Sequence, residues 1–266
     1  MSIAIKNLDS NTRLYSVANL PESDGKPMAE SPKHVQEIKE ALNVLQEYFR
    51  PRPEFVVYAN IFIYYLDEIG VLKRVSPDIL VARDIANEDR RVYAVEREGK
   101  GPDMVIEFTS KKTKKIDLGR KRRIYAWLEV KEYFLFDPHG EYLKPRFQGF
   151  QLIGGEYVPM TAAAGMRLYS EVLGLNLVVE ENSLRFYDPR TGERLRTHRE
   201  AEAERRQETA ARRQEITARK AAEQKAQQEA AARRAAEENA QQEAAARQAA
   251  EIELARLREE LVRLYK

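Results

Sequence analysis

The chain has 266 residues, which is enough for one sizeable domain with an appendage or for two small domains. It has no cysteine, which excludes disulfides, thiolate zinc sites and cysteine nucleophiles, and its net charge of +2 gives no global sign of a nucleic-acid partner. Charged residues make up 33% of the chain and the mean hydropathy is -0.62, so we expect part of it to be a solvated extension. No run approaches the roughly 18 apolar residues that span a bilayer, and the opening residues lack the apolar core of a signal peptide. We therefore expect a soluble, cytoplasmic protein with no membrane partner.

The first predicted element is a helix that follows a polar, irregular entry. It begins at Ser31 and Pro32, because serine is a good N-cap and proline suits the first helical position. Pro51 and Pro53 then end it. Apolar residues recur between these points at steps of three and four and predict one buried stripe: Val35, Ile38, Leu42, Leu45 and Phe49.

Apolar runs rich in β-formers follow, at residues 55–58, 61–65, 80–82, 104–108 and 133–136. The first two are either one long strand or two short ones. The run at 104–108 is continuous and predicts a central strand. A basic turn at 111–115 leads into a predicted helix at 117–128, whose spacing places Tyr125 and Trp127 in the core. Residues 139–155 predict turns and edge strands, and residues 175–179 and 184–187 predict a final hairpin.

The last part of the chain has a different composition. Beyond Gly192 there is neither glycine nor proline, and the residues are mostly Ala, Glu, Arg and Gln, which are strong helix formers. The segment AQQEAAAR at 226–233 recurs at 240–247, a shift of 14 residues or two heptads. Leu254, Leu257, Leu261 and Leu264 continue with coiled-coil spacing. We predict a globular domain at 1–195 and a helical tail at 196–266, roughly 100 Å long at 1.5 Å per residue. The tail either joins a homodimer or higher homo-oligomer through its leucines or remains a solvated single helix.

Two acids adjoin apolar runs in the middle of the chain. Asp78 follows Pro77 directly before one predicted strand, and Glu107 lies within another. A carboxylate at such an edge is costly unless it is paired or binds a cation. Two carboxylates with a carbonyl and waters suit Mg²⁺, and a nearby lysine could orient a water or stabilise an oxyanion. On spacing alone the signal is weak, because acids beside strands are common and an ordinary surface salt bridge explains most of them.

Several motifs in order give this pattern a more specific interpretation. PDILVARD, PDMVIEFTS and DLGRKRRIYAWLEVKEYFLFDP, with GKPMAESPKH upstream and LGLNLVVEENSLRFYDPRTGERL downstream, resemble the Uma-two family, a branch of the PD-(D/E)XK nuclease superfamily. The resemblance covers most of residues 25–200 and leaves out the tail. It implies an α/β fold in which helices flank a mixed sheet, DNA as the substrate, and Mg²⁺, with Mn²⁺ as a substitute, held between the motif acids.

Individual residues take roles from this resemblance. Asp78 resembles the PD-motif aspartate, and Glu107 resembles the acid of the third motif. The superfamily usually has lysine two residues after that acid, where this chain has Thr109. The lysine of this branch is expected on the following helix, in D-L-G-x-K, where Lys121 stands. The carbonyl of Phe108 is then expected as a further metal contact, and Glu30 as the first-motif acid that supports the metal through water.

Other charged residues in the region have weaker assignments. A basic cluster surrounds the expected site and suits phosphate contacts or, equally, a solvated turn; it comprises Lys111, Lys112, Lys114, Lys115, Arg120, Arg122 and Arg123. Asp117 is expected to cap its helix rather than bind metal. Asp103 repeats the Pro-Asp pattern and is either a site acid or a structural acid at a strand edge. The three histidines have no metal-ligand spacing and receive no catalytic role.

Three functions are compatible with the sequence. The first is a metal-dependent DNA endonuclease in which the tail promotes self-association and brings two nuclease domains together to cut both strands. The second is a catalytically silent DNA-binding or scaffold protein that keeps the nuclease fold. The third is a nuclease that acts on RNA. Intact Asp78, Glu107 and Lys121 favour an enzyme, and the sequence does not separate DNA from RNA.

Overall fold

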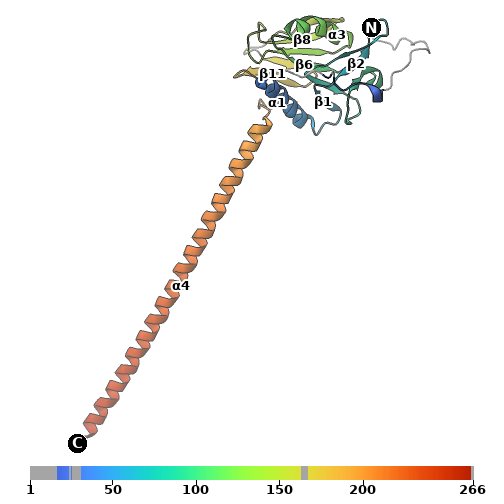
Figure 1. Ribbon diagram of the computed structural model, residues 1–266. Helices are drawn as coiled ribbons and strands as arrows, with labels where there is room; N and C mark the ends of the chain where they lie inside the picture. The colour runs from blue at the N-terminus through green and yellow to red at the C-terminus, as the bar shows by residue number, and fades with distance from the viewer. Residues whose placement is uncertain (1–16, 24, 26–30, 163–166, 265–266) are drawn as a thin grey trace. The chain divides into compact units, whose positions relative to one another are not determined.

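The computed structural model describes residues 17–23, 25, 31–162 and 167–264 (Figure 1). The chain divides into two units, residues 1–201 and 202–266. The first unit is a mixed α/β domain, as predicted. The second is helical throughout its described length.

A six-stranded sheet forms the centre of the first unit, in the order β1-β4-β6-β7-β8-β9. Only β6 and β7 pair in parallel in this sheet, and the other neighbours are antiparallel. The prediction of a central strand at 104–108 is confirmed, because β6 lies between β4 and β7. The strand bounds are β1 Phe55–Ala59, β4 Ile79–Arg83, β6 Met104–Phe108, β7 Glu132–Phe136, β8 Phe147–Ile153 and β9 Glu156–Pro159.

Both faces of this sheet are buried. Alternate side chains of a strand point to opposite faces, so Ile106 and Phe108 enter one apolar core while Val105 enters the other. Helix α1 (Pro32–Phe49) covers the first face, and helix α3 (Arg122–Trp127) covers the second (Figure 1). Two-sided burial explains why the runs at 104–108 and 133–136 are continuously apolar in sequence.

Helix α1 follows its sequence signals. Ser31 is the N-cap, with its Oγ accepting from the backbone N–H of His34 at 3.3 Å, and Pro32 occupies the first turn. Buried Glu37 ties the helix to the final hairpin by accepting hydrogen bonds from the hydroxyl of Ser183 and the N–H of Leu184. That hairpin is β11 (Leu175–Glu180) and β12 (Ser183–Tyr187), close to the predicted ranges, and β10 (Leu168–Ser170) extends it to three strands.

The runs at 55–58 and 61–65 form two separate strands in different sheets. Strand β2 (Ile63–Leu66) leaves the central sheet and pairs with β3 (Leu72–Val75) and β5 (Tyr93–Ala94). The short helix α2 (Val95–Glu98) follows β5, and a 3₁₀ turn, η1 (Val17–Asn19), precedes α1. Sequence reasoning missed β3, β5, α2, β9 and β10.

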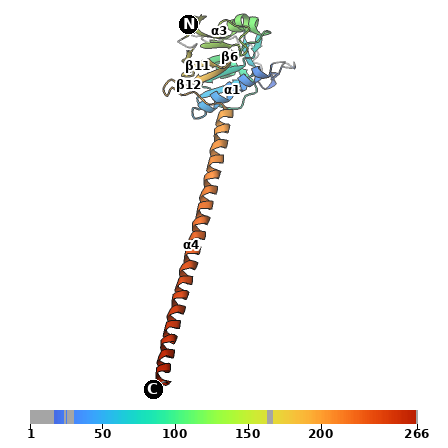
Figure 2. The same ribbon diagram turned by 90° about the vertical axis from the view of Figure 1, so that its left-hand side faces the viewer.

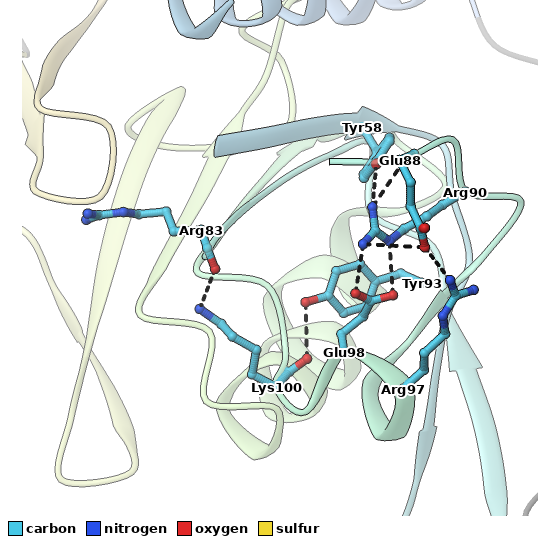
Figure 3. A network of polar contacts seen from close by, with 8 residues as sticks. All are labelled: Tyr58, Arg83, Glu88, Arg90, Tyr93, Arg97, Glu98 and Lys100. Carbon is cyan, nitrogen blue, oxygen red and sulfur yellow. Dashed lines mark hydrogen bonds and ion pairs between the residues drawn. The ribbon is translucent and has the colours of Figure 1, made fainter. Parts of the chain in front are cut away.

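A buried ion pair fixes the segment that leads into β6 (Figure 3). The Arg90 guanidinium donates two hydrogen bonds of 2.9 Å to the Glu98 carboxylate, and the two side chains are 1% and 5% exposed. Arg90 also donates to the Tyr58 hydroxyl at 2.9 Å, and that hydroxyl donates to the Glu88 carbonyl at 2.7 Å. Tyr93, which is fully buried, donates to the Lys100 carbonyl at 3.1 Å. These contacts hold the approach to the central strand in one conformation.

The second unit consists of most of a single helix, α4 (His198–Leu264), of 67 residues (Figure 2). It begins with a capping box, in which Glu200 accepts from the N–H of Thr197 at 2.9 Å and the Thr197 hydroxyl accepts from the N–H of Glu200 at 3.3 Å. Among the described helices, none has the length and apolar character needed to cross a membrane.

Candidate active site

Asp78 and Glu107 lie opposite each other on neighbouring strands. The antiparallel register of β4 and β6 pairs Ile79 with Ile106, so the next position along places Asp78 opposite Glu107. The backbone N–H of Phe108 donates to Asp78 Oδ2 at 2.6 Å, which anchors the aspartate where the ladder ends. Both acids follow the alternation that sends Leu80 and Val105 into the second core, the one beneath α3.

Helix residues engage both oxygens of Glu107. The side chain of Glu107 is 1% exposed. Lys121 Nζ lies 2.7 Å from its Oε2, and the Tyr125 hydroxyl donates to Oε1 at 2.6 Å. The structure therefore brings Glu107 and Lys121 into direct contact, with Asp78 on the adjoining strand.

A π-helical segment, η2 (Ile116–Lys121), positions the lysine. It replaces the regular first turns of the helix predicted at 117–128 and runs directly into α3. The Tyr133 hydroxyl donates to the Asp117 carbonyl at 3.0 Å and so satisfies one carbonyl within this turn. Insertions of this type often occur at functional sites. Asp117, Lys121 and Tyr125 follow one another at intervals of four residues and face β6.

The prediction that Asp117 caps the helix is wrong. Neither oxygen of its carboxylate has a hydrogen-bond partner, the side chain is 1% exposed, and Oδ1 lies 3.6 Å from Lys121 Nζ. The prediction that Trp127 lies in the core is also wrong, because this residue is 43% exposed. Tyr125 is fully buried, as predicted. The helix turns Tyr125 toward the sheet, and only the indole N–H of Trp127 is fixed, to the Leu66 carbonyl at 3.3 Å.

The cluster holds more negative than positive charge. Burial, followed by the charges of Asp78 and Asp117, raises the pKa of Glu107 to about 8 against the opposing effect of Lys121. Burial acts to lower the pKa of Lys121, but the carboxylates of Glu107, Asp78 and Asp117 outweigh it and raise that pKa. Burial also raises the pKa of Tyr125, which keeps its phenol protonated as a donor. Lys121 is therefore the cationic member of the cluster.

The N-terminus of α1 approaches Asp78 from the other side. His34 is 5% exposed, and its Nε2 lies 3.9 Å from Asp78 Oδ2. The Nε2 of His139 is 3.1 Å from the Ser31 hydroxyl that caps the same helix. Of the histidines that the sequence left without a role, His34 thus lies beside Asp78 and His139 lies beside the cap of the same helix, and only the folded chain brings them there.

The predicted phosphate-binding residues differ in their surroundings. Lys111, Lys112 and Lys114 are exposed on the turn that precedes the π segment, and Arg120 is exposed within the segment itself. Arg122 is instead packed against the domain, since its guanidinium donates to the Tyr157 carbonyl at 2.7 Å and lies 4.4 Å from the Phe150 ring centroid. Arg122 therefore has a packing role in this structure, and the exposed four remain candidates for phosphate contact.

The remaining candidates have simpler placements. Phe108 ends β6 beside both acids, and Glu30 lies outside the described residues. Asp103 is a structural acid: it accepts from the N–H of Arg83 and from the amines of Lys100 and Lys131. Thr109, where the superfamily has lysine, is fully buried, and its Oγ1 has no hydrogen-bond partner in the structure.

The carboxylates of this cluster suit a divalent cation whose remaining ligands are backbone carbonyl, water or phosphate oxygens. Within the described part of the chain, no three His, Cys, Asp or Glu side chains are arranged to hold a metal ion. Asp78, Glu107 and Asp117 nevertheless surround one amine, and neither oxygen of Asp117 has a hydrogen-bond partner. Hard oxygen donors with excess negative charge fit Mg²⁺ completed by backbone carbonyl, water or phosphate oxygens.

The fold and this acid–amine cluster together define a nuclease-like α/β protein. Residues 20–180 match the family model of Uma2, described as "Putative restriction endonuclease", and the chain belongs to that family. One solved structure, described as "a putative nuclease belonging to DUF820 from Anabaena variabilis ATCC 29413", aligns at 16% identity with a TM-score of 0.42. The alignment covers 59% of this chain and 87% of that one. No curated protein matches the chain.

Proposed function

We propose that the protein is a metal-dependent endonuclease that hydrolyses phosphodiester bonds of DNA. The observation that carries the proposal is the buried contact of Lys121 with Glu107, 2.7 Å apart, beside an aspartate on the neighbouring strand. Family membership supports the reaction class. Asp78 and Glu107 would hold Mg²⁺, with Mn²⁺ as a substitute, together with the Phe108 carbonyl and Glu30.

Each residue has a defined task in this reaction. A divalent cation would neutralise charge on the phosphate and lower the pKa of a water that it binds. The Lys121 ammonium group would donate a hydrogen bond to a phosphate oxygen or orient the attacking water. Tyr125 holds Glu107 in place through one oxygen, leaving further lone pairs on that carboxylate. The exposed basic residues Lys111, Lys112, Lys114 and Arg120 would contact flanking phosphates.

Plasmid cleavage tests the proposal directly. Wild-type protein should nick or linearise plasmid DNA with Mg²⁺ or Mn²⁺ and not with EDTA. Asp78→Asn and Glu107→Gln keep side-chain size while removing charge, so both should abolish cleavage. Glu156→Gln, at an exposed position of β9, is the matched control and should retain it. Cleavage that persists in EDTA or in both site variants would rule out this site.

A catalytically silent nuclease fold that binds nucleic acid is the second candidate. The replacement of the usual lysine by Thr109 favours it, as does the engagement of both Glu107 oxygens by protein groups. Binding without cleavage, at a salt dependence reporting several phosphate contacts, would support this alternative. Comparing DNA with RNA of the same sequence in both assays identifies the substrate class.

We also propose that α4 promotes self-association through its last heptads. Three of the four seam leucines, Leu254, Leu257 and Leu261, are between 50% and 54% exposed. Apolar residues at coiled-coil spacing on a solvated helix favour pairing with a second copy. Ending the chain after Ala201, where the first unit ends, should then leave a folded monomer in sedimentation experiments.

A further inference from the structure

Asp117 is a buried carboxylate that the fold leaves without hydrogen bonds. It is 1% exposed, and neither Oδ1 nor Oδ2 has a hydrogen-bond partner in the structure. Burial raises the pKa of Asp117 against the opposing effects of the Lys121 charge and of the Thr113 and Thr109 hydroxyls. Such a group costs the fold free energy, so a role other than stability accounts better for its presence.

Its contact with charge is directed at Lys121. Asp117 Oδ1 lies 3.6 Å from Lys121 Nζ, and Glu107 Oε2 lies 2.7 Å from the same nitrogen. The ammonium group therefore has two carboxylate neighbours, one on its own helix and one on β6. The π segment makes this possible, because Asp117 and Lys121 bracket the widened turn and both face the sheet.

Glu107 and Asp117, the two carboxylates beside Lys121, have different roles in the proposed function. Glu107 is the residue assigned to the cation, and a cation at that carboxylate repels and competes with the ammonium group. Asp117 lies on the helix, so it can still attract Lys121 when Glu107 is engaged. We propose that Asp117 is a positioning residue that keeps Lys121 in the site when a divalent cation binds Glu107; this rests on the proposed function.

Measurements can distinguish this positioning role of Asp117 from the role of a structural acid and from that of a metal ligand. A structural acid would support the fold, and its loss would lower the melting temperature. A ligand would contribute to metal affinity as Glu107 does. A positioning residue should leave both largely unchanged and alter the state of Lys121 in the presence of metal.

The test compares two aspartates with equal burial and opposite surroundings. Asp103 and Asp117 both have side chains 1% exposed, but Asp103 accepts hydrogen bonds from Arg83, Lys100 and Lys131. In EDTA, Asp117→Asn should melt at or above the wild-type temperature, because it removes an unsatisfied buried charge. Asp103→Asn should melt lower by at least about 4 °C. A comparable fall for Asp117→Asn would overturn the proposal in favour of a structural role.

Two further measurements, both independent of cleavage, complete the test. Calorimetric titration with Mn²⁺ should give Asp117→Asn an affinity within about threefold of wild type, whereas Glu107→Gln loses binding. In NMR spectra of lysine ε-groups, Mg²⁺ should leave Lys121 ordered in wild type and release it to a free-lysine signal in Asp117→Asn. Loss of Mn²⁺ affinity equal to that of Glu107→Gln, or an unchanged Lys121 signal, overturns the proposal.

Cleavage kinetics then link positioning to the reaction. Asp117→Asn should lower kcat by about 10- to 100-fold with KM for DNA unchanged, since misplacing a catalytic group has effects of this size. Asp117→Glu should restore part of kcat. If wild-type protein binds Mn²⁺ but cuts no DNA, the proposed function fails while the NMR result still decides the role of Asp117. A wild-type kcat in Asp117→Asn overturns the positioning role alone.

Discussion

If Glu107 holds the proposed cation, metal binding at this residue is coupled to proton release. Burial and the neighbouring acids raise its pKa to about 8, so the metal-free carboxyl takes up a proton at higher pH than an ordinary glutamate does. A divalent cation needs the ionised form and displaces that proton. Proton and metal therefore compete for one side chain, and the balance shifts toward metal as pH rises.

This competition predicts a pH-dependent metal affinity. The increase in melting temperature on adding Mn²⁺ should be small at pH 6 and grow as pH rises through about 8. Differential scanning calorimetry in matched buffers measures it. Asp117→Asn is the informative comparison, because it removes one of the acids that raise the pKa of Glu107 without removing a proposed metal ligand, and it should shift the pH dependence to lower values. A melting shift independent of pH would argue against Glu107 as a ligand.

The same carboxyl makes an opposite contribution to the stability of the metal-free protein. Its pKa is raised in the folded state above the usual glutamate value of 4.5, so the stabilisation is complete below about 4.5 and is lost as pH rises to about 8. In EDTA, the free energy of unfolding of wild type should therefore fall across this window relative to that of Glu107→Gln. Urea denaturation at several pH values measures the difference. Parallel curves for the two proteins would contradict the assignment.

Secondary-structure elements differ in how directly the sequence predicts them. Ser31 and Pro32 predict the start of α1 because capping is a local interaction between neighbours in sequence. The runs that form β6 and β7 are readable because burial on both faces makes every residue apolar. By contrast, β3 reads LKRV, with two exposed basic residues, and its pairing with β2 comes from the tertiary fold.

The candidate site shows the same division. Motif resemblance pointed to Asp78, Glu107 and Lys121, and the strand register then explains why the first two are neighbours. The resemblance gave Asp117 no part in the site, because an ordinary helix beginning at 117 makes it an N-cap. The widened turn that buries it depends on Tyr133 bonding its carbonyl, a contact between distant elements. The four-residue spacing of Asp117, Lys121 and Tyr125 was the sequence signal available.

The segment between β4 and β6 depends on one buried ion pair. Glu98→Gln removes the buried counter-ion of Arg90 and leaves only the half-exposed Glu88 carboxylate, 3.9 Å from the guanidinium. Breaking a buried pair typically costs 3–5 kcal/mol, and because Glu88 remains we expect a loss near the lower end, about 3 kcal/mol. Urea denaturation followed by circular dichroism measures the loss. The control is Glu223→Gln, which breaks the exposed pair with Arg219 in α4, where both side chains are more than half exposed. That change should cost less than about 1 kcal/mol. Equal effects of the two substitutions would show that burial does not decide the strength of these pairs.

At the level of the whole chain, the residues at the coiled-coil core positions of α4, its seam, are leucines only near the end of the helix. Tracing the spacing of Leu254 and Leu257 back toward the N-terminus meets only alanine and charged residues: Ala250, Arg247, Glu243, Ala240, Ala236, Arg233, Glu229, Ala226, Ala222, Arg219, Glu215, Arg212 and Glu208. In a parallel, in-register pair, each of these arginines and glutamates would face its own copy. Like charges in facing layers disfavour pairing, so apolar contact between copies is confined to the final heptads.

The proposed self-association should therefore depend on very few residues. Burying a leucine side chain contributes about 1.5–3 kcal/mol, so replacing Leu254 and Leu257 together by aspartate should weaken association at least about 100-fold. Analytical ultracentrifugation over a range of concentrations measures the change. The matched control is Ile252→Asp, because Ile252 is 64% exposed and lies two residues before Leu254, off the seam. If Ile252→Asp dissociates the protein as strongly as the leucine variant, general surface hydrophobicity rather than a heptad seam holds the copies together. If wild type stays monomeric at about 100 μM, α4 is a solvated single helix.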